Sequence, residues 1–561
     1  MQSPAGPLRK VTWRAVALSA VVLLTSTACT ATPLPTPATT ASPAAPAPTA
    51  TFNFGTGSEP MGFDPALVAD TESYRVTRQV LEGLVTIDPV TSAPAPSLAT
   101  KWTELDNGLG YSFALRPDVT FQDGTAFDAA AVCTNFQRWF TLPPAIRGDG
   151  SATMFKQVFR GFSDEPDYTI YQGCSVDGPL KVTLSVKVRL TGFLQALTLP
   201  AFAISSPAAL TSGTANVLDE QFSGKKISRY AQHPVGTGPF TFTSATVGAV
   251  TMNAYPNYWG EKGDIKTLNF KTFNEPDTRY AALDDGSIDG FDPVTPGNYD
   301  KLIKNGKQVL QRDPFSVVYL GINQKIPVLA DRKVREAIAG SIDKASLVSN
   351  YFIAGTAATA QFIPPKLSGF NNAVEGIPYD PAKAKEVLAA SSYKGEELKF
   401  YYPTNAARPY LPLPEKVYAQ IATNLTATGF NIKPVPIPWN EGYVPAVTGN
   451  EDHALSLLGW NGSYADPDNF VGPLFGSPTK LLGMDDPQLV SKITRARSIP
   501  DGPDRVAAYE AISKQLAATV PAVPLAFPIS ALALSSRVVF YPLSPVLNEV
   551  FNKVKLAPAP Q

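Results

Sequence analysis

The chain has 561 residues, of which 44% are apolar and 17% are charged, and its formal net charge is −1. This length exceeds what one hydrophobic core supports and predicts two or three subdomains, while the near-zero charge favours neither nucleic acid nor an anionic membrane surface as a partner. Only two histidines and three cysteines occur, which are too few residues to favour a His/Cys metal cluster or a His-based catalytic triad. We expect no metal, no cofactor and no catalytic residues.

The pattern of the N-terminus predicts an export signal. Basic residues precede an apolar stretch over 15–24, which is too short to span a membrane and has the length of a signal-peptide core. The Ser-Thr-Ala-Cys segment over 26–29 resembles the lipobox of bacterial lipoproteins, with Ser26 where a Leu is usual. We expect a signal peptide over 1–28 and lipidation of Cys29; a plain secretory signal cleaved close by is the alternative.

A tether follows the lipidated residue and completes the segment 29–50. Residues 30–50 contain only Ala, Thr, Pro, Ser and one Leu. Such a composition cannot form a core, and its prolines favour an extended chain that reaches up to roughly 60 Å. We expect a protein held by its lipid on the extracytoplasmic face of the cell membrane.

The other two cysteines suggest a disulfide. With Cys29 assigned to lipid, Cys133 and Cys174 remain as an even pair in an oxidising compartment. Their bridge would close a loop of about 40 residues and add about 4 kcal/mol in the chain-entropy model. Two free buried thiols are the alternative.

The first half of the folded chain is rich in strand and turn patterns. Residues 51–55 alternate like a strand, a helix is expected through 74–81, and 102–115 reads as a hairpin around an Asp-Asn-Gly turn. Asp128 can cap a further helix. The Gly/Pro-dense segment 233–240 is interpreted as a backbone turn, because the G-x-G-x-x-G and Gly-Lys-Ser/Thr patterns of phosphate-binding loops are absent.

The clearest local pattern is a strand–helix–strand unit that follows a helix starting at Asp380. The strand over 398–402 is followed by a helix over 415–428, which Gly429 terminates, and by a strand over 432–437. This order predicts a right-handed crossover in a parallel sheet.

The crossover predicts where a ligand would bind, because ligands of such sheets lie beyond the carboxyl ends of the strands. Loop 403–413 leaves one strand, and loop 460–470 leaves the apolar run 454–458. If both strands are parallel members of one sheet, the aromatic and polar side chains of these loops share one crevice. The candidate ligand-binding residues are Arg408, Tyr410, Trp460, Asn461, Ser463, Tyr464, Asp466 and Asp468.

Each part of this prediction has a plainer alternative. The guanidinium of Arg408 suits a ligand carboxylate, but it could equally be a solvated surface group. The stretch 454–470 could be an ordinary surface loop whose Trp460 is tucked into the core.

A series of short segments, each weak alone, occurs in one order along the chain. The segments are Ser58-Glu59-Pro60, Asp64-Pro65, Leu98-Ala99, Trp102, Tyr111–Arg116, Phe121–Thr125, Pro234–Phe240, Asn257-Tyr258-Trp259, Val334–Ile338, Ile342-Asp343 and Gly459-Trp460. Together they make residues 52–542 resemble the extracytoplasmic solute-binding proteins of ABC importers, in the oligopeptide/dipeptide/nickel-binding family 5.

Within that family the chain looks most like the dipeptide-binding branch, through Arg408-Pro409-Tyr410 and the Asp-Pro-Asp-Asn-Phe segment 466–470. The resemblance implies an Arg that takes the peptide carboxylate and an Asp, three residues after the Trp, that takes the α-ammonium. Here that position is Ser463, and loss of a charge-assisted hydrogen bond weakens binding roughly ten- to a hundredfold. Either Asp466 or Asp468 substitutes, or the ligand lacks a free α-amine there.

The resemblance also implies the fold, which is α/β and two-lobed, of the periplasmic-binding-protein type (type II, large cluster with an extra subdomain). Mixed sheets flanked by helices would form two lobes that close on a ligand. We expect lobe I over 51–314 with the extra subdomain at about 98–210, lobe II over 315–522, and a return to lobe I over 523–561.

The implied function is that of a monomeric substrate-binding lipoprotein, which captures short peptides or peptide-like solutes for ABC permease subunits in the membrane. The alternative is a non-transport lipoprotein of the same fold that regulates cell-envelope assembly or signalling. An enzyme is disfavoured, since Ser341-Ile342-Asp343-Lys344 is one of several Ser-x-x-Lys matches and no Lys-Thr-Gly or Ser-Asp-Asn occurs. Nickel is disfavoured because neither histidine lies on the two loops.

Overall fold

The computed structural model describes residues 50–557 apart from residues 90, 148–152, 212–214, 219, 223 and 463. The predicted signal peptide, Cys29, most of the tether and Ser463 therefore lie outside the described residues. Within the described part of the chain, no helix combines the length and the apolar character that a membrane crossing requires.

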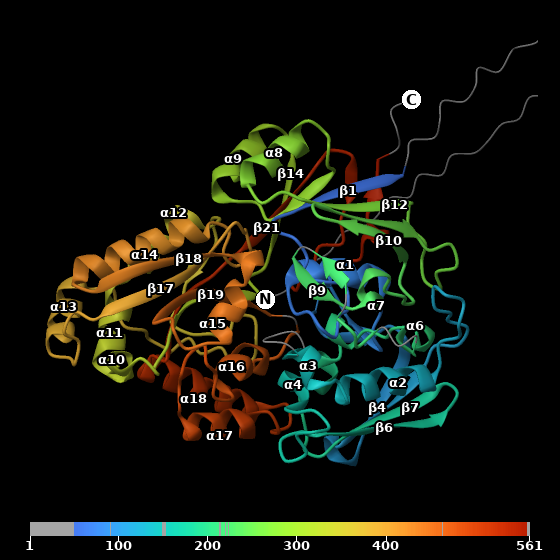
Figure 1. Cartoon of the computed structure of the whole chain (residues 1–561), viewed down its shortest axis with the longest axis horizontal. Coiled ribbons are helices and arrows are strands. Elements are labelled where there is room, and N and C mark those ends of the chain that lie inside the picture. Colours follow the sequence, from blue (N-terminus) through green and yellow to red (C-terminus); the bar gives the residue numbers. More distant parts are fainter. Residues whose placement is uncertain are drawn as a thin grey trace, which may run out of the picture. The chain divides into compact units, whose positions relative to one another are not determined.

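A seven-stranded mixed sheet organises lobe I (Figure 1). Its first strand, β1 (Thr51–Thr56), pairs in parallel with β12 (Thr267–Thr272) and with β13 (Gly290–Asp292). Phe52 and Phe54 are fully buried because alternate side chains of a strand point to one face. The other strands are β10 (Phe240–Thr246), β11 (Ala249–Ala254), β14 (Gln308–Arg312) and β21 (Ser530–Leu534). The main helices are α1 (Thr71–Val80), α8 (Pro276–Asp284) and α9 (Pro296–Lys304).

The turn over 233–240 serves backbone packing in lobe I. A side chain at Gly236 would collide with the carbonyl oxygen of Val80. A Cβ on Gly238 would lie 2.7 Å from the carbonyl oxygen of Gln79. Only glycine lets this turn approach the end of α1 so closely.

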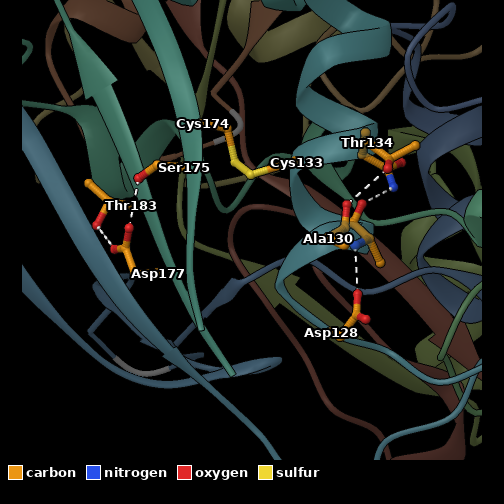
Figure 2. The surroundings of a disulfide bond; sticks show 10 residues. Asp128, Ala130, Cys133, Thr134, Cys174, Ser175, Asp177 and Thr183 are labelled. Atoms are coloured by element: carbon orange, nitrogen blue, oxygen red, sulfur yellow. Dashed lines mark hydrogen bonds between the residues drawn. A yellow bond between two sulfur atoms is a disulfide. The ribbon is translucent and has the colours of Figure 1, made fainter. Parts of the chain in front are cut away.

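The extra subdomain is a four-stranded antiparallel sheet, packed by α2 (Ala129–Phe140), which Asp128 caps as expected. The strands are β4 (Ala99–Leu105), β5 (Gly110–Leu115), β6 (Tyr171–Gly178) and β7 (Lys181–Val186). The predicted disulfide is confirmed: it joins Cys133 on α2 to Cys174 on β6, with the Cα atoms 5.4 Å apart (Figure 2). Beside it, Asp177 accepts hydrogen bonds from the Ser175 and Thr183 hydroxyls.

Lobe II is built on a six-stranded mixed sheet. Its strands are β15 (Ser316–Ile322), β16 (Ala357–Ala358), β17 (Glu397–Thr404), β18 (Asn431–Pro438), β19 (Leu455–Asn461) and β20 (Ala522–Phe527). Its helices are α10 (Pro327–Ala330), α11 (Arg332–Ser341), α12 (Lys344–Tyr351), α13 (Pro381–Ala389), α14 (Pro414–Thr428), α15 (Tyr443–Thr448), α16 (Asp468–Phe475), α17 (Pro487–Ala496) and α18 (Pro503–Thr519).

The strand–helix–strand unit of lobe II has the predicted order. β17 pairs in parallel with β18, and α14 packs on both strands (Figure 1). Val417, Ile421 and Leu425 are fully buried because their spacing places them on one face of α14. β17 also pairs in parallel with β19. The carboxyl ends of all three strands therefore meet at one edge of the sheet.

The chain passes between the two large sheets twice. The first passage lies between β14 and β15, next to the boundary expected at 314. We expected the return at 523, but β20 still pairs with β15, so the chain leaves the lobe II sheet after Phe527. Pro524 fits within β20 because β16 pairs only with Ala526 and Phe527, and no ladder bond is lost on that side.

Candidate ligand-binding site

The two predicted loops meet at the carboxyl edge of the lobe II sheet. Arg408 and Leu411 exchange backbone hydrogen bonds of 3.1 and 3.0 Å, which fold the loop after β17 into a tight turn. The ring of Tyr410 packs against Gly459 of β19, where any side chain would collide with it. Trp460 follows directly. The loop after β17 and the end of β19 thus meet through Tyr410 and Gly459, while the Trp460 ring packs against other core residues.

Arg408 is a buried cation with unused donors. The residue is 3% exposed, and its guanidinium carbon lies 3.9 Å from the ring centroid of Trp439. Its Nε and Nη2 atoms have no hydrogen-bond partner among the described residues. Because an uncompensated buried charge is strongly unfavourable, this guanidinium is suited to receive an anionic group.

Trp439, over which Arg408 lies, is a further candidate site residue that the sequence did not suggest. It comes directly after β18, the third of the parallel strands. The rule that placed Arg408 and Trp460 in the crevice applies equally to the loop after β18. That rule was the signal that could have found Trp439.

Lobe I lies against this edge. The side-chain amide of Asn461 donates a hydrogen bond of 3.0 Å to the Thr71 hydroxyl at the start of α1. A Cβ on Gly57, just after β1, would lie 2.8 Å from the carbonyl oxygen of Ala407. The described residues therefore form a closed arrangement, in which lobe I covers the loops that carry the candidate site.

The extra subdomain makes a second contact with lobe II. The Thr191 amide donates to the Arg497 carbonyl at 3.0 Å, and the Thr191 hydroxyl donates to the Ile499 carbonyl at 2.7 Å. Tyr464 is buried at this contact and packs in the core of the extra subdomain.

Asp466 and Asp468 lie in the same contact and are already paired. Asp466 accepts from Arg505 Nη2 at 2.9 and 2.8 Å, and Asp468 accepts from Arg497 Nε at 2.6 Å. Burial raises the pKa of Asp466 to about 6, although the Arg505 cation opposes that shift. Neither carboxylate is paired with Arg408, and their predicted contact with a ligand stays a prediction, as does that of Ser463.

A groove of about 500 Å³ opens between the lobes next to the Arg408 turn. It is lined by residues 274–277 and 295–298 of lobe I and by residues 405–407 and 412–416 of lobe II, among others. This volume lies in the range typical of small-molecule sites, about 300–1,000 Å³, but the lining of the groove includes none of the predicted ligand-binding residues.

Comparison with known proteins assigns this chain to a family. The model of the bacterial extracellular solute-binding proteins, family 5, matches residues 93–481. The chain is a family 5 solute-binding protein. The resemblance inferred from the sequence is thereby confirmed, and as a member of this family the chain is a binding protein and not an enzyme.

Curated relatives of this family 5 protein are similar over almost their whole length. The chain is 26% identical to heme-binding protein A of Haemophilus influenzae, covering 89% of this chain and 91% of the relative. It is 25% identical to the dipeptide-binding protein of Escherichia coli, covering 89% and 93%.

Solved structures confirm the predicted two-lobed fold class of the family 5 protein. The dipeptide-binding protein from Pseudoalteromonas sp. SM9913 in complex with Met-Leu has a TM-score of 0.81 at 21% identity, covering 90% of this chain and 100% of that one. DppA from Helicobacter pylori in complex with peptide STSA has a TM-score of 0.79 at 24% identity, covering 90% and 98%.

Proposed function

We propose that this family 5 protein captures short peptides or peptide-like solutes outside the cytoplasm and delivers them to an ABC permease. It acts as a monomer and is held on the membrane by a lipid on Cys29. Two curated relatives are named as dipeptide- or di/tripeptide-binding proteins, and two structural neighbours contain peptides.

The observation that carries the proposal is the buried guanidinium of Arg408 at the covered edge of lobe II, whose Nε and Nη2 atoms have no hydrogen-bond partner within the part of the chain that the structure describes. A peptide C-terminus offers the planar carboxylate that a guanidinium binds best. The ring of Trp439, over which the guanidinium lies, and the ring of Tyr410 in the same turn supply apolar walls. A solute that contacts both lobes stabilises the closed arrangement, and this arrangement is the state that a permease would recognise.

Calorimetric titration with free peptides and their C-terminal amides tests this function. Arg408→Ala should weaken binding of the free peptides at least about tenfold, because a hydrogen-bonded charge is lost, while the melting temperature of the empty protein changes little. Arg332→Ala removes a guanidinium that is 59% exposed on α11 and should leave binding unchanged. Equal binding by wild type and Arg408→Ala would remove Arg408 from the site.

Native mass spectrometry of protein purified without denaturation separates transport from the regulatory alternative. A transport protein should retain a small solute between its closed lobes. A protein that carries no solute and whose melting temperature no peptide raises would favour the non-transport lipoprotein.

A further inference from the structure

A second buried charge lies where lobe I covers the site. Thr71, which accepts the hydrogen bond from Asn461, is followed by Glu72 in the first turn of α1. The Glu72 side chain is almost fully buried, with the residue 1% exposed. Its Oε2 atom accepts a hydrogen bond of 2.8 Å from Arg75 Nε. Its Oε1 atom has no partner among the described residues.

The charges of Glu72 in lobe I and Arg408 in lobe II interact across the contact between the lobes. Burial raises the pKa of Glu72 above its ordinary value, and the charges of Arg75 and Arg408 oppose that shift. Each of the two groups keeps at least one buried polar atom that no described residue hydrogen-bonds. A buried polar atom left without a hydrogen bond is costly, so both groups favour a solute that carries one anionic and one cationic end.

Other carboxylates close to this contact are less suited to a cationic group. Asp292 is paired with Arg75 and Arg312 at 2.9 and 3.0 Å. Asp70 caps α1 by accepting from the Ser73 amide through Oδ1 and is only partly buried. Its Oδ2 atom also lacks a partner among the described residues, so Asp70→Asn tests it as the rival to Glu72. Asp466 and Asp468 are paired with arginines.

We propose that Glu72 of lobe I binds the ammonium group of a dipolar solute whose carboxylate is bound by Arg408 of lobe II. This inference rests on the proposed function and deepens it, because the site would then select zwitterions such as free peptides. It also accounts for a neutral Ser463 where the dipeptide-binding branch has an Asp. A solute held by opposite charges on the two lobes draws them together, which couples recognition to closure.

The test uses Met-Leu and Ser-Thr-Ser-Ala, the peptides present in two structural neighbours. Each is titrated as the free peptide, as the N-acetyl peptide and as the C-terminal amide. In wild type, each blocking group should weaken binding at least about tenfold. In Glu72→Gln the side-chain oxygen can still accept from Arg75. We expect N-acetylation to weaken binding to this variant by less than about threefold (the N-acetyl penalty), while amidation of the C-terminus should weaken it as much as in wild type (the amide penalty).

Two variants serve as controls. Asp70→Asn keeps a good helix cap and should retain both penalties. Glu261→Gln neutralises a carboxylate that is 82% exposed and should also retain both. A full N-acetyl penalty in Glu72→Gln, or its loss in Asp70→Asn, would overturn the role of Glu72 and leave the proposed function standing. No binding of either free peptide by wild type would overturn both.

A crystal structure of the wild-type complex with Met-Leu provides a readout that no variant can compromise. The peptide nitrogen should lie within about 3 Å of Glu72 Oε1. A peptide bound to Arg408 with its ammonium away from Glu72 would contradict the inference directly.

Discussion

Asn461 at the end of β19 and Thr71 at the start of α1 are joined by a hydrogen bond of 3.0 Å, which links lobe II to lobe I. The bond lies between the residue after Trp460 and the residue before Glu72. Any motion that separates the lobes must break it. The contact therefore belongs to the closed state, and its loss should affect the binding of any ligand that requires closure.

Thr71→Val should weaken ligand binding by roughly two- to tenfold, which corresponds to one hydrogen bond of about 0.5–1.5 kcal/mol. Thr71→Ser keeps the hydroxyl and should bind almost like wild type. Calorimetry gives the affinities, and small-angle scattering of the empty proteins compares their degree of closure. Equal affinities for the Val and Ser variants would show that this bond does not stabilise the closed state.

The disulfide should stabilise the fold without influencing the ligand. It joins Cys133 and Cys174, 41 positions apart, within the extra subdomain. The double substitution Cys133→Ser/Cys174→Ser should lower the free energy of unfolding by about 4 kcal/mol through loop-closure entropy. Thermal or denaturant unfolding measures this loss, with the reduced wild type as control.

Peptide affinity of the double variant should stay within about twofold of wild type, because the bond joins α2 to β6 inside the extra subdomain, whereas Arg408 lies on the loop after β17. A large loss of affinity would show that the extra subdomain, against which Tyr464 and Trp460 pack, transmits the loss of the bond to the ligand site. An unchanged unfolding free energy would contradict the entropic contribution.

The local elements of lobe II could be predicted because their signals are short-range. α14 begins with Pro414 in its first turn and ends at Gly429, which has a φ of 116°. Such capping residues act within a few positions. The sheet of lobe I could not be predicted in this way. β1 lies between β12 and β13, and nothing in residues 51–55 indicates those distant partners.

The candidate site shows the same limit for side chains. Arg408 and Trp460 could be placed together because the carboxyl ends of parallel strands meet at one edge. The sequence could not show that Asp466 and Asp468 are paired, because Arg505 and Arg497 come from α18 and the end of α17. It also gave no reason to place Glu72, from the other lobe, near Arg408.

Glu82 predicts a pH dependence of stability. Its carboxylate accepts hydrogen bonds from Tyr258 at 2.9 Å, Trp259 at 2.7 Å and Thr237 at 2.8 Å. These hydrogen bonds hold Pro234–Phe240 and Asn257-Tyr258-Trp259, two segments of the family pattern, next to the end of α1. Burial raises the pKa of Glu82 to about 7, while these hydrogen bonds oppose the shift.

Because the folded pKa lies above the ordinary value of 4.5, the folded protein binds more protons than the unfolded chain between these two values. The contribution of Glu82 is therefore fully present below pH 4.5 and is lost as the pH rises through about 7, by at most about 3 kcal/mol. Glu82→Gln does not titrate. The melting temperature of wild type minus that of Glu82→Gln should fall over this window, and a constant difference would contradict the raised pKa.

Ser463→Asp should raise the affinity for free peptides, because it supplies the carboxylate that the dipeptide-binding branch carries at this position. If Glu72 already binds the ammonium in wild type, the gain should be small there and at least about tenfold in Glu72→Gln, where the charge is missing. Ser463→Asn introduces a side chain of the same size as Asp but without its charge. It should raise peptide affinity neither in wild type nor in Glu72→Gln. Calorimetry with Met-Leu on the four combinations of Glu72→Gln and Ser463→Asp measures this coupling. Equal gains in both backgrounds would mean that positions 72 and 463 act on different parts of the ligand, and no gain in either would mean that an ammonium group does not reach position 463.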